Sequence, residues 1–171
     1  MKNYEINEDT YAIISKDIGK TEVIEKNNNY IVDNDAYKVM DESCKYYGSS
    51  YKGRLEAAKT LLNCSYKLPI LVEESSVLIF FPIKSSLLDD CCWINLNSIS
   101  NIEKVDNKSK ITFKNGQEIV FDISKLSLEN QIYRSTMLES IIFKRINIKK
   151  EINISFSLFL ALFCDIIILC V

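Results

Sequence analysis

The sequence contains no histidine, and this absence excludes the commonest catalytic constellations. Neither a Ser-His nor a Cys-His nucleophile pair can be built, and no imidazole is available to bind a metal. The P-loop, G-x-S-x-G and G-x-G-x-x-G patterns are also missing. Paired carboxylates occur at Glu73-Glu74 and Asp89-Asp90, but such pairs usually lie in solvated turns. We therefore predict a protein that is not an enzyme and that needs no cofactor.

The cysteines show no pattern typical of a metal centre. The chain has six, and no two of them form a C-x-x-C pair. A structural zinc site would then need an unusual set of scattered thiolates. Residues 1–25 contain no continuous apolar core of the kind found in a signal peptide. We expect reduced cysteines that pack as small hydrophobic side chains in a cytoplasmic protein without a metal site.

The two signs of charge nearly balance, with a net charge of −2, but their distribution along the chain is uneven. Residues 1–42 hold 5 basic and 10 acidic residues, whereas residues 43–150 hold 16 basic and 11 acidic ones. An acidic front and a basic middle suit an anionic partner for the middle, or they reflect an unevenly charged solvated surface. The length of 171 residues and the hydrophobic content of 47% predict one domain with a genuine core.

The clearest turn lies at Asn115-Gly116. It separates Ile111–Phe113 from Ile119–Phe121, and both runs are rich in β-branched and aromatic residues. Asn-Gly between two such runs predicts a hairpin with a two-residue turn, because both central residues tolerate positive φ.

A helix is predicted after Asp122, where the apolar spacing changes from two to between three and four. Ser127 is the expected N-cap, with Asn130 and Gln131 in the first turn. The apolar residues that can share one face are Leu128, Ile132, Leu138, Ile141 and Ile142. Arg134, Lys144 and Arg145 are left for another face, so this helix carries amides and then cations.

The rest of the chain before residue 111 predicts mostly antiparallel strands. Residues 97–110 are polar and predict a loop. The segments expected to form strands are Tyr4–Ile6, Tyr11–Ile14, Thr21–Glu25, Tyr30–Val32, Pro69–Val72, Val77–Phe81 and Cys92–Leu96. With two main helices, the predicted class is α+β, built from antiparallel β strands and hairpins.

The segment SCKYYGSSYKGR, residues 43–54, combines three tyrosines and three cations with small residues. Such a mixture suits contact with phosphates and sugars. It equally suits a helix N-terminus, in which Ser49 or Ser50 is the cap and Leu55, Ala58, Leu61 and Leu62 form the buried face. Both interpretations can hold together.

The end of the sequence, Ile152–Val171, is apolar apart from Asp165. Its length is close to that of a membrane span, although a carboxylate is costly in lipid. The alternatives are a tail anchor, a last core element, or a segment that is not native to the domain.

Several motifs together resemble the competence transcription factor family, ComK. They are SCKYYGSSYKGR (43–54), Lys67–Ile70, Phe81-Pro82, Cys92–Ile94 and FKNGQEIVFDISKLSLENQIYRS (113–135). The resemblance extends with gaps from about residue 4 to about residue 146, and its last block is the most specific. It implies a cytoplasmic, nucleoid-associated activator of competence (genetic transformation) genes that binds paired A/T-rich DNA boxes from the minor groove. It also implies a homo-oligomer and a Clp protease adaptor as partners.

The family motifs also suggest which residues contact DNA. Tyr51, Lys52 and Arg54 match G-S-S-Y-x-G-R, and Asn130, Gln131 and Arg134 match N-Q-x-x-R. The DNA-binding residues expected from the resemblance are Lys45, Tyr51, Lys52, Arg54, Asn130, Gln131 and Arg134. Asn130 and Gln131 either recognise base edges or lock the loop before the helix.

The chain departs from the family pattern where a polar, charged tail would be expected. We therefore predict a ComK-like DNA-binding domain over residues 1–150 and an atypical apolar tail over residues 151–171. Two rival functions remain open. One is a non-DNA-binding interaction module or decoy derived from a truncated ComK-type protein, and the other is a membrane-anchored protein.

Overall fold

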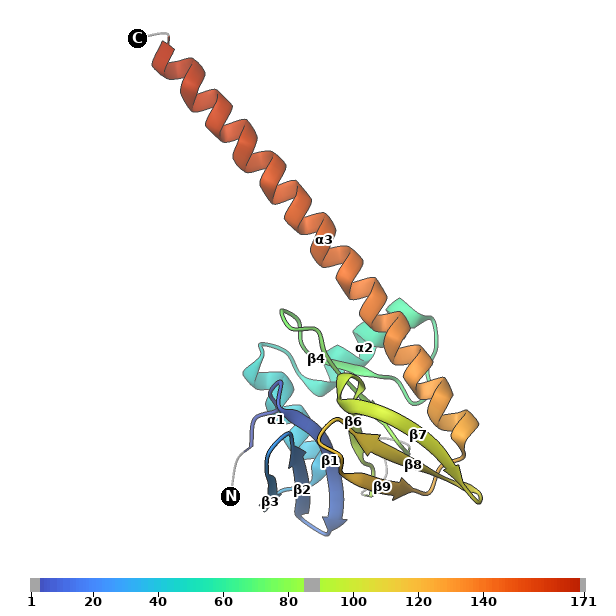
Figure 1. Ribbon diagram of the computed structural model, residues 1–171. Helices are drawn as coiled ribbons and strands as arrows, with labels where there is room; N and C mark the ends of the chain where they lie inside the picture. Colours follow the sequence, from blue (N-terminus) through green and yellow to red (C-terminus); the bar gives the residue numbers. More distant parts are fainter. Residues whose placement is uncertain (1–3, 85–89, 170–171) are drawn as a thin grey trace. The chain divides into compact units, whose positions relative to one another are not determined.

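The computed structural model describes residues 4–84 and 90–169, with side chains described as far as residue 151. The chain divides into two compact units, residues 1–139 and residues 140–171. Figure 1 labels the elements.

The first unit is organised around a six-stranded antiparallel sheet. Trp93 and its neighbours are buried in a central strand of the sheet, whose two faces are covered by separate apolar cores. Asn95 ties the sheet together, since its side-chain amide donates to the carbonyl of Thr10 at 2.8 Å. From edge to edge the strands are β3 (Asn29–Val32), β2 (Lys20–Glu25), β1 (Thr10–Asp17), β6 (Trp93–Asn95), β5 (Leu78–Pro82) and β4 (Ile70–Glu73).

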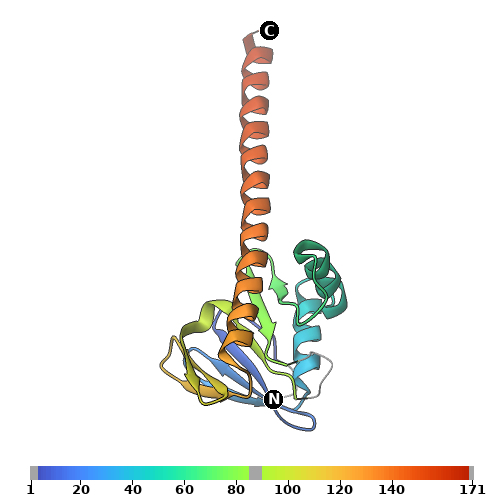
Figure 2. The same cartoon turned by 90° about the vertical axis from the view of Figure 1, so that its right-hand side faces the viewer.

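Two helices, α1 (Ala36–Tyr46) and α2 (Tyr51–Leu62), cover one face of this sheet, as Figure 2 shows. Val39, Met40 and Cys44 of α1 are buried against strand residues such as Phe80 and Trp93. The hydroxyl of Ser50 accepts a hydrogen bond from the Gly53 N–H at 3.1 Å, so Ser50 is the cap of α2, one of the two residues predicted for it. The sequence did not predict α1 as a separate helix.

A three-stranded antiparallel sheet covers the opposite face (Figure 2). It consists of β7 (Ile99–Val105), β8 (Lys108–Phe113) and β9 (Glu118–Phe121), and the short 3-10 turn η1 (Leu96–Ser98) leads into it. Its apolar residues form a second core with the large sheet, in which Phe113 stacks on Tyr11 at 6.2 Å between ring centroids.

Three local predictions are wrong. Residues 97–110 contain most of η1, all of β7 and the start of β8, and are not a loop. Tyr4–Ile6 is irregular chain and not a strand, although Tyr4 and Ile6 are buried. The Asn-Gly turn is longer than predicted. The Gly116 N–H donates to the Phe113 carbonyl at 2.9 Å, and the Phe113 N–H donates to the Gln117 carbonyl at 2.8 Å. Gly116 has φ +84°, whereas Asn115 keeps a negative φ, so three residues close the hairpin.

The helix after this hairpin, α3 (Lys125–Leu169), begins earlier than predicted. Ser124 is its cap, because its hydroxyl accepts from the Ser127 N–H at 3.3 Å and its carbonyl accepts from the Leu128 N–H at 3.0 Å. Ser127 therefore lies inside the first turn. The α+β class with mostly antiparallel strands is confirmed, and the described residues contain three α-helices.

The second unit, residues 140–171, is helical as far as Leu169. The alternatives for Ile152–Val171 depend on side chains that lie outside the described ones. Over the residues that the structure does describe, no helix has both the length and the apolar character needed to cross a membrane.

Candidate nucleic-acid interface

The predicted DNA-binding residues come from two places, and the first is the junction between α1 and α2. Lys45 lies in the last turn of α1, where its ammonium forms ion pairs with Asp41 at 2.7 Å and with Glu42 at 3.0 Å. These hydrogen bonds, first to Asp41 and then to Glu42, hold the pKa of Lys45 above its ordinary value. Its positive charge is therefore already matched by two carboxylates within its own helix.

Tyr51 and Arg54 also serve the junction itself. Only 3% of Tyr51 is exposed, and its ring packs edge-on against Trp93 at 6.3 Å. Its N–H donates to the Asp41 carboxylate at 2.9 Å. The Arg54 guanidinium, half-buried, donates to the Tyr47 carbonyl at 3.4 Å and so holds the turn between the helices. This core position of Tyr51 does not fit the DNA contact that the resemblance implies.

Lys52 is different from its neighbours. It is exposed in the first turn of α2, and among the described residues it forms no ion pair. Its ammonium is thus available to a phosphate, with no internal partner to lose.

The second place is the first part of α3, where helical spacing separates neighbours in sequence. Leu128, Gln131, Ser135 and Leu138 recur every three or four residues and are buried. Asn130 is exposed, and Arg134, four residues further on, is half-exposed on the same side. Gln131 is only 3% exposed, so its core position does not fit contact with base edges.

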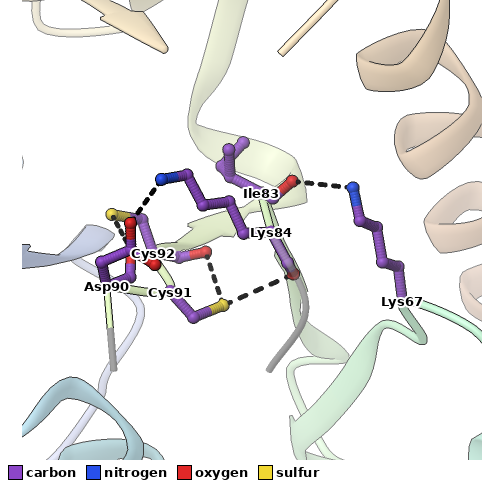
Figure 3. Close-up of polar contacts among 6 residues, drawn as sticks. All are labelled: Lys67, Ile83, Lys84, Asp90, Cys91 and Cys92. Carbon is purple, nitrogen blue, oxygen red and sulfur yellow. Dashed lines mark hydrogen bonds and ion pairs between the residues drawn. The ribbon is translucent and has the colours of Figure 1, made fainter. Parts of the chain in front are cut away.

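Arg134 reaches a loop in which no DNA-binding residue was predicted. Its guanidinium donates to the carbonyl of Tyr66 at 2.7 Å, across 68 residues of sequence. Lys67, the next residue, places its ammonium 5.5 Å from the centre of the Tyr66 ring. Figure 3 shows the same ammonium pointing to the carbonyl of Ile83, at 3.3 Å. Lys67 belongs to one of the motifs that carry the resemblance, but nothing in the sequence shows that its loop meets α3.

These contacts define a loop–α3 surface made of Tyr66, Lys67, Asn130 and Arg134. Within the part of the chain that the structure describes, neither Lys67 nor Arg134 is paired with a carboxylate. Hydrogen bonds to neutral carbonyls orient both cations and leave their charge uncompensated. The surface therefore offers two positive charges, one amide and one exposed aromatic ring.

Lys52 is not part of the loop–α3 surface. It lies at the start of α2, and Tyr66 lies beyond its end. A 12-residue helix is about 18 Å long at a rise of 1.5 Å per residue. Lys52 and Arg134 therefore lie apart and do not form one cluster of cations.

The remaining chemistry of the described residues is structural. No group of three or more potential metal ligands occurs among them. Cys44 and Cys91 are buried free thiols, and burial raises the pKa of Cys44 to about 11 and that of Cys91 to about 12. In Figure 3 Cys91 and Cys92 donate to backbone carbonyls, next to the ion pair between Lys84 and Asp90. Thiols with such pKa values are poor nucleophiles at neutral pH.

The surface of this α+β domain thus combines uncompensated cations, an amide and an aromatic ring, which are groups that nucleic-acid-binding surfaces also use. Comparison with known proteins gives the family. The model of the ComK protein family matches residues 1–147, so the chain belongs to the ComK family.

One relative shows the same relationship along most of its length. The chain is 33% identical over 144 residues to the "Competence transcription factor" of Bacillus subtilis (strain 168). The matched region covers 82% of this chain and 75% of that protein. No solved structure matches the chain.

Proposed function

We propose that this protein is a DNA-binding transcriptional activator of competence genes. The observation that carries the proposal is the identity of 33%, over most of both chains, with a protein named for regulating transcription in competence. A function in transcription also supports the expectation that the chain is not an enzyme.

The proposed partner is A/T-rich duplex DNA, approached from the minor groove. A/T-rich tracts have a narrow minor groove whose negative potential attracts Lys and Arg. No carboxylate among the described residues pairs with Arg134 or Lys67, and backbone carbonyls orient both side chains. Both cations are therefore suited to contact the minor groove. Asn130, beside Arg134, can bond to the acceptors on the floor of the groove. Lys52 adds a phosphate contact further along the duplex.

The test is binding of the purified full chain to labelled duplexes, followed by fluorescence anisotropy. One duplex carries two A/T-rich boxes, and a second of equal length is G·C-rich. We expect tighter binding to the A/T duplex and an affinity that falls as salt rises, because phosphate contacts release counterions. A minor-groove drug such as netropsin should compete, whereas methyl green, which occupies the major groove, should not. Equal affinity for both duplexes would refute the proposal.

The other proposals rest on the resemblance to the family. They are a DNA-binding domain over residues 1–150, assembly as a homo-oligomer, location in the cytoplasm with the nucleoid, and delivery to a Clp protease by an adaptor. Sedimentation velocity of the full chain tests the oligomer.

For the apolar tail, residues 151–171, the alternative is membrane attachment. Cell fractionation tests it, and recovery of the protein in the soluble fraction contradicts it.

One observation favours the second candidate, an interaction module or decoy that does not bind DNA. Leu126, Tyr133 and Met137 of α3 are exposed, and they follow one another at helical spacing as an apolar stripe. Such a stripe suits a protein partner. This function is favoured if the wild type does not bind the A/T duplex and a Leu126→Gln/Met137→Gln variant loses the self-association of the wild type.

A further inference from the structure

Tyr66 is an exposed aromatic residue on a loop whose backbone is fixed from several sides. Its side chain is 61% exposed, although aromatic rings of this size usually bury most of their surface. The loop follows α2, whose C-cap residue, Asn63, has the left-handed conformation (φ +48°). Lys67 has the same unusual conformation, with φ +47°. Two such residues within five positions give the loop a specific shape and leave it few alternatives.

Two cations hold the loop in place. Arg134 donates to the carbonyl of Tyr66 from α3, and Lys67 donates to the carbonyl of Ile83 at the end of β5 (Figure 3). Leu68 and Pro69, which follow, are buried. The backbone at Tyr66 is therefore anchored to α3, to β5 and to the core, while its ring faces solvent. A ring held in this way loses little conformational entropy when a partner binds it.

The charges around the ring indicate which partner fits. Lys67 lies 5.5 Å from the ring centre, Arg134 bonds to the same residue, and neither has a carboxylate partner among the described residues. A protein partner with an apolar pocket would have to bury two charges that nothing compensates, which is costly. A polyanion with apolar sugars and base faces between its charges satisfies the ring and the cations together.

We propose that Tyr66 is a DNA-contacting residue whose ring packs against deoxyribose and base edges, while Lys67 and Arg134 fix the ring and meet the flanking phosphates. This inference rests on the proposed function and adds an aromatic contact that the sequence motifs do not assign. In this arrangement Arg134 positions Tyr66 through the backbone carbonyl, and its own positive charge also attracts the phosphates.

Tyr46 provides a matched control. It is 62% exposed, it lies next to Lys45, and its ring packs edge-on against Tyr47 at 5.0 Å. The cation beside it is neutralised by Asp41 and Glu42. Tyr46 thus has the same exposure and the same neighbouring residue type without the uncompensated charge.

The experiment measures the affinity of the full-length wild type, Tyr66→Ala, Tyr66→Phe and Tyr46→Ala for the A/T duplex across a salt titration. Loss of an aromatic contact lowers affinity equally at every salt concentration, because no counterion is involved. We expect Tyr66→Ala to bind about tenfold more weakly with an unchanged salt slope, a magnitude typical of one aromatic–base contact. Tyr66→Phe and Tyr46→Ala should bind like the wild type.

The outcomes separate this inference from the proposed function. If the wild type prefers the A/T duplex and Tyr66→Ala binds it equally well, the inference is overturned and the proposed function stands. If Tyr66→Ala instead changes the sedimentation coefficient and leaves DNA affinity intact, the ring serves a protein contact. Without any A/T preference in the wild type, both fall. Thermal melting of each variant checks the fold, and a Tyr66→Leu variant separates loss of the aromatic ring from loss of bulk.

Discussion

Replacing Gln131 by Met separates a structural role of this residue from a role in recognising DNA. Gln131 lies on α3 with 3% of its surface exposed, and among the described residues its carbonyl oxygen Oε1 has no hydrogen-bond partner. A buried, unsatisfied polar group costs about 1–3 kcal/mol. Methionine has nearly the same length and helix propensity but no such oxygen.

We expect Gln131→Met to raise the free energy of unfolding by about 1 kcal/mol, the lower end of that range. For a chain of this length the melting temperature should rise by about 2–4 °C. Urea denaturation followed by circular dichroism measures the change. DNA affinity should stay at the wild-type value, since the side chain faces the core.

The neighbouring residue is the control. Asn130 is exposed, so Asn130→Ala should change stability by less than about 0.5 kcal/mol. If its amide bonds to base edges, the same change should weaken binding to the A/T duplex by about tenfold. The opposite pattern would refute the reasoning: a Gln131→Met variant that folds normally but loses DNA affinity would mean that Gln131 leaves the core to contact DNA.

Three further predictions concern the folded domain. Trp93→Ala removes a fully buried ring beneath Tyr51 and should cost about 3–5 kcal/mol in urea denaturation, so a smaller loss contradicts the core assignment. Ser50→Ala removes the cap of α2 and should cost about 1 kcal/mol, whereas Ser50→Gly should cost only a few tenths. Burial raises the pKa of Glu73, but hydrogen bonds from Ser75 and Ser76 outweigh it and lower the pKa from 4.5 to about 2. This stabilisation is complete above pH 4.5 and is lost as the pH falls toward 2, so melting curves of Glu73→Gln should depend less on pH over that interval.

Several apolar strands and the cap of α2 could be predicted from the sequence because their determinants are local. The hairpin of β4 and β5 and the burial of Trp93 follow from continuous apolar runs, and the Ser50 cap follows from its position before a helical pattern. Strand β7 could not be predicted in this way. The polar face of β7 is stabilised by an ion pair to β8, in which the Lys110 ammonium lies 2.8 Å from the Glu103 carboxylate. Such a cross-strand contact produces no alternating apolar pattern within either strand.

The candidate site was only partly accessible from the sequence for a related reason. Tyrosine and glutamine occur both in cores and on surfaces, so the motif positions of Tyr51 and Gln131 did not disclose that both are buried. Ser124, not Ser127, caps α3, and this shift of three residues also changes the turn in which Asn130 lies. The contact between Arg134 and Tyr66 joins residues far apart in sequence, so the loop–α3 surface appears only in the fold.

The most direct test of the account is the salt dependence of DNA binding by a Lys67→Gln/Arg134→Gln variant of the full chain. If the loop–α3 surface meets phosphates, the slope of log K against log salt should become shallower by about 0.9 for each lost contact. The matched control is Lys16→Gln, which removes a positive charge from an ion pair with Glu22 on β1 and β2. We predict a reduced slope in the double variant and a wild-type slope in the control. Wild-type affinity and slope in both would contradict the assignment of this surface to DNA.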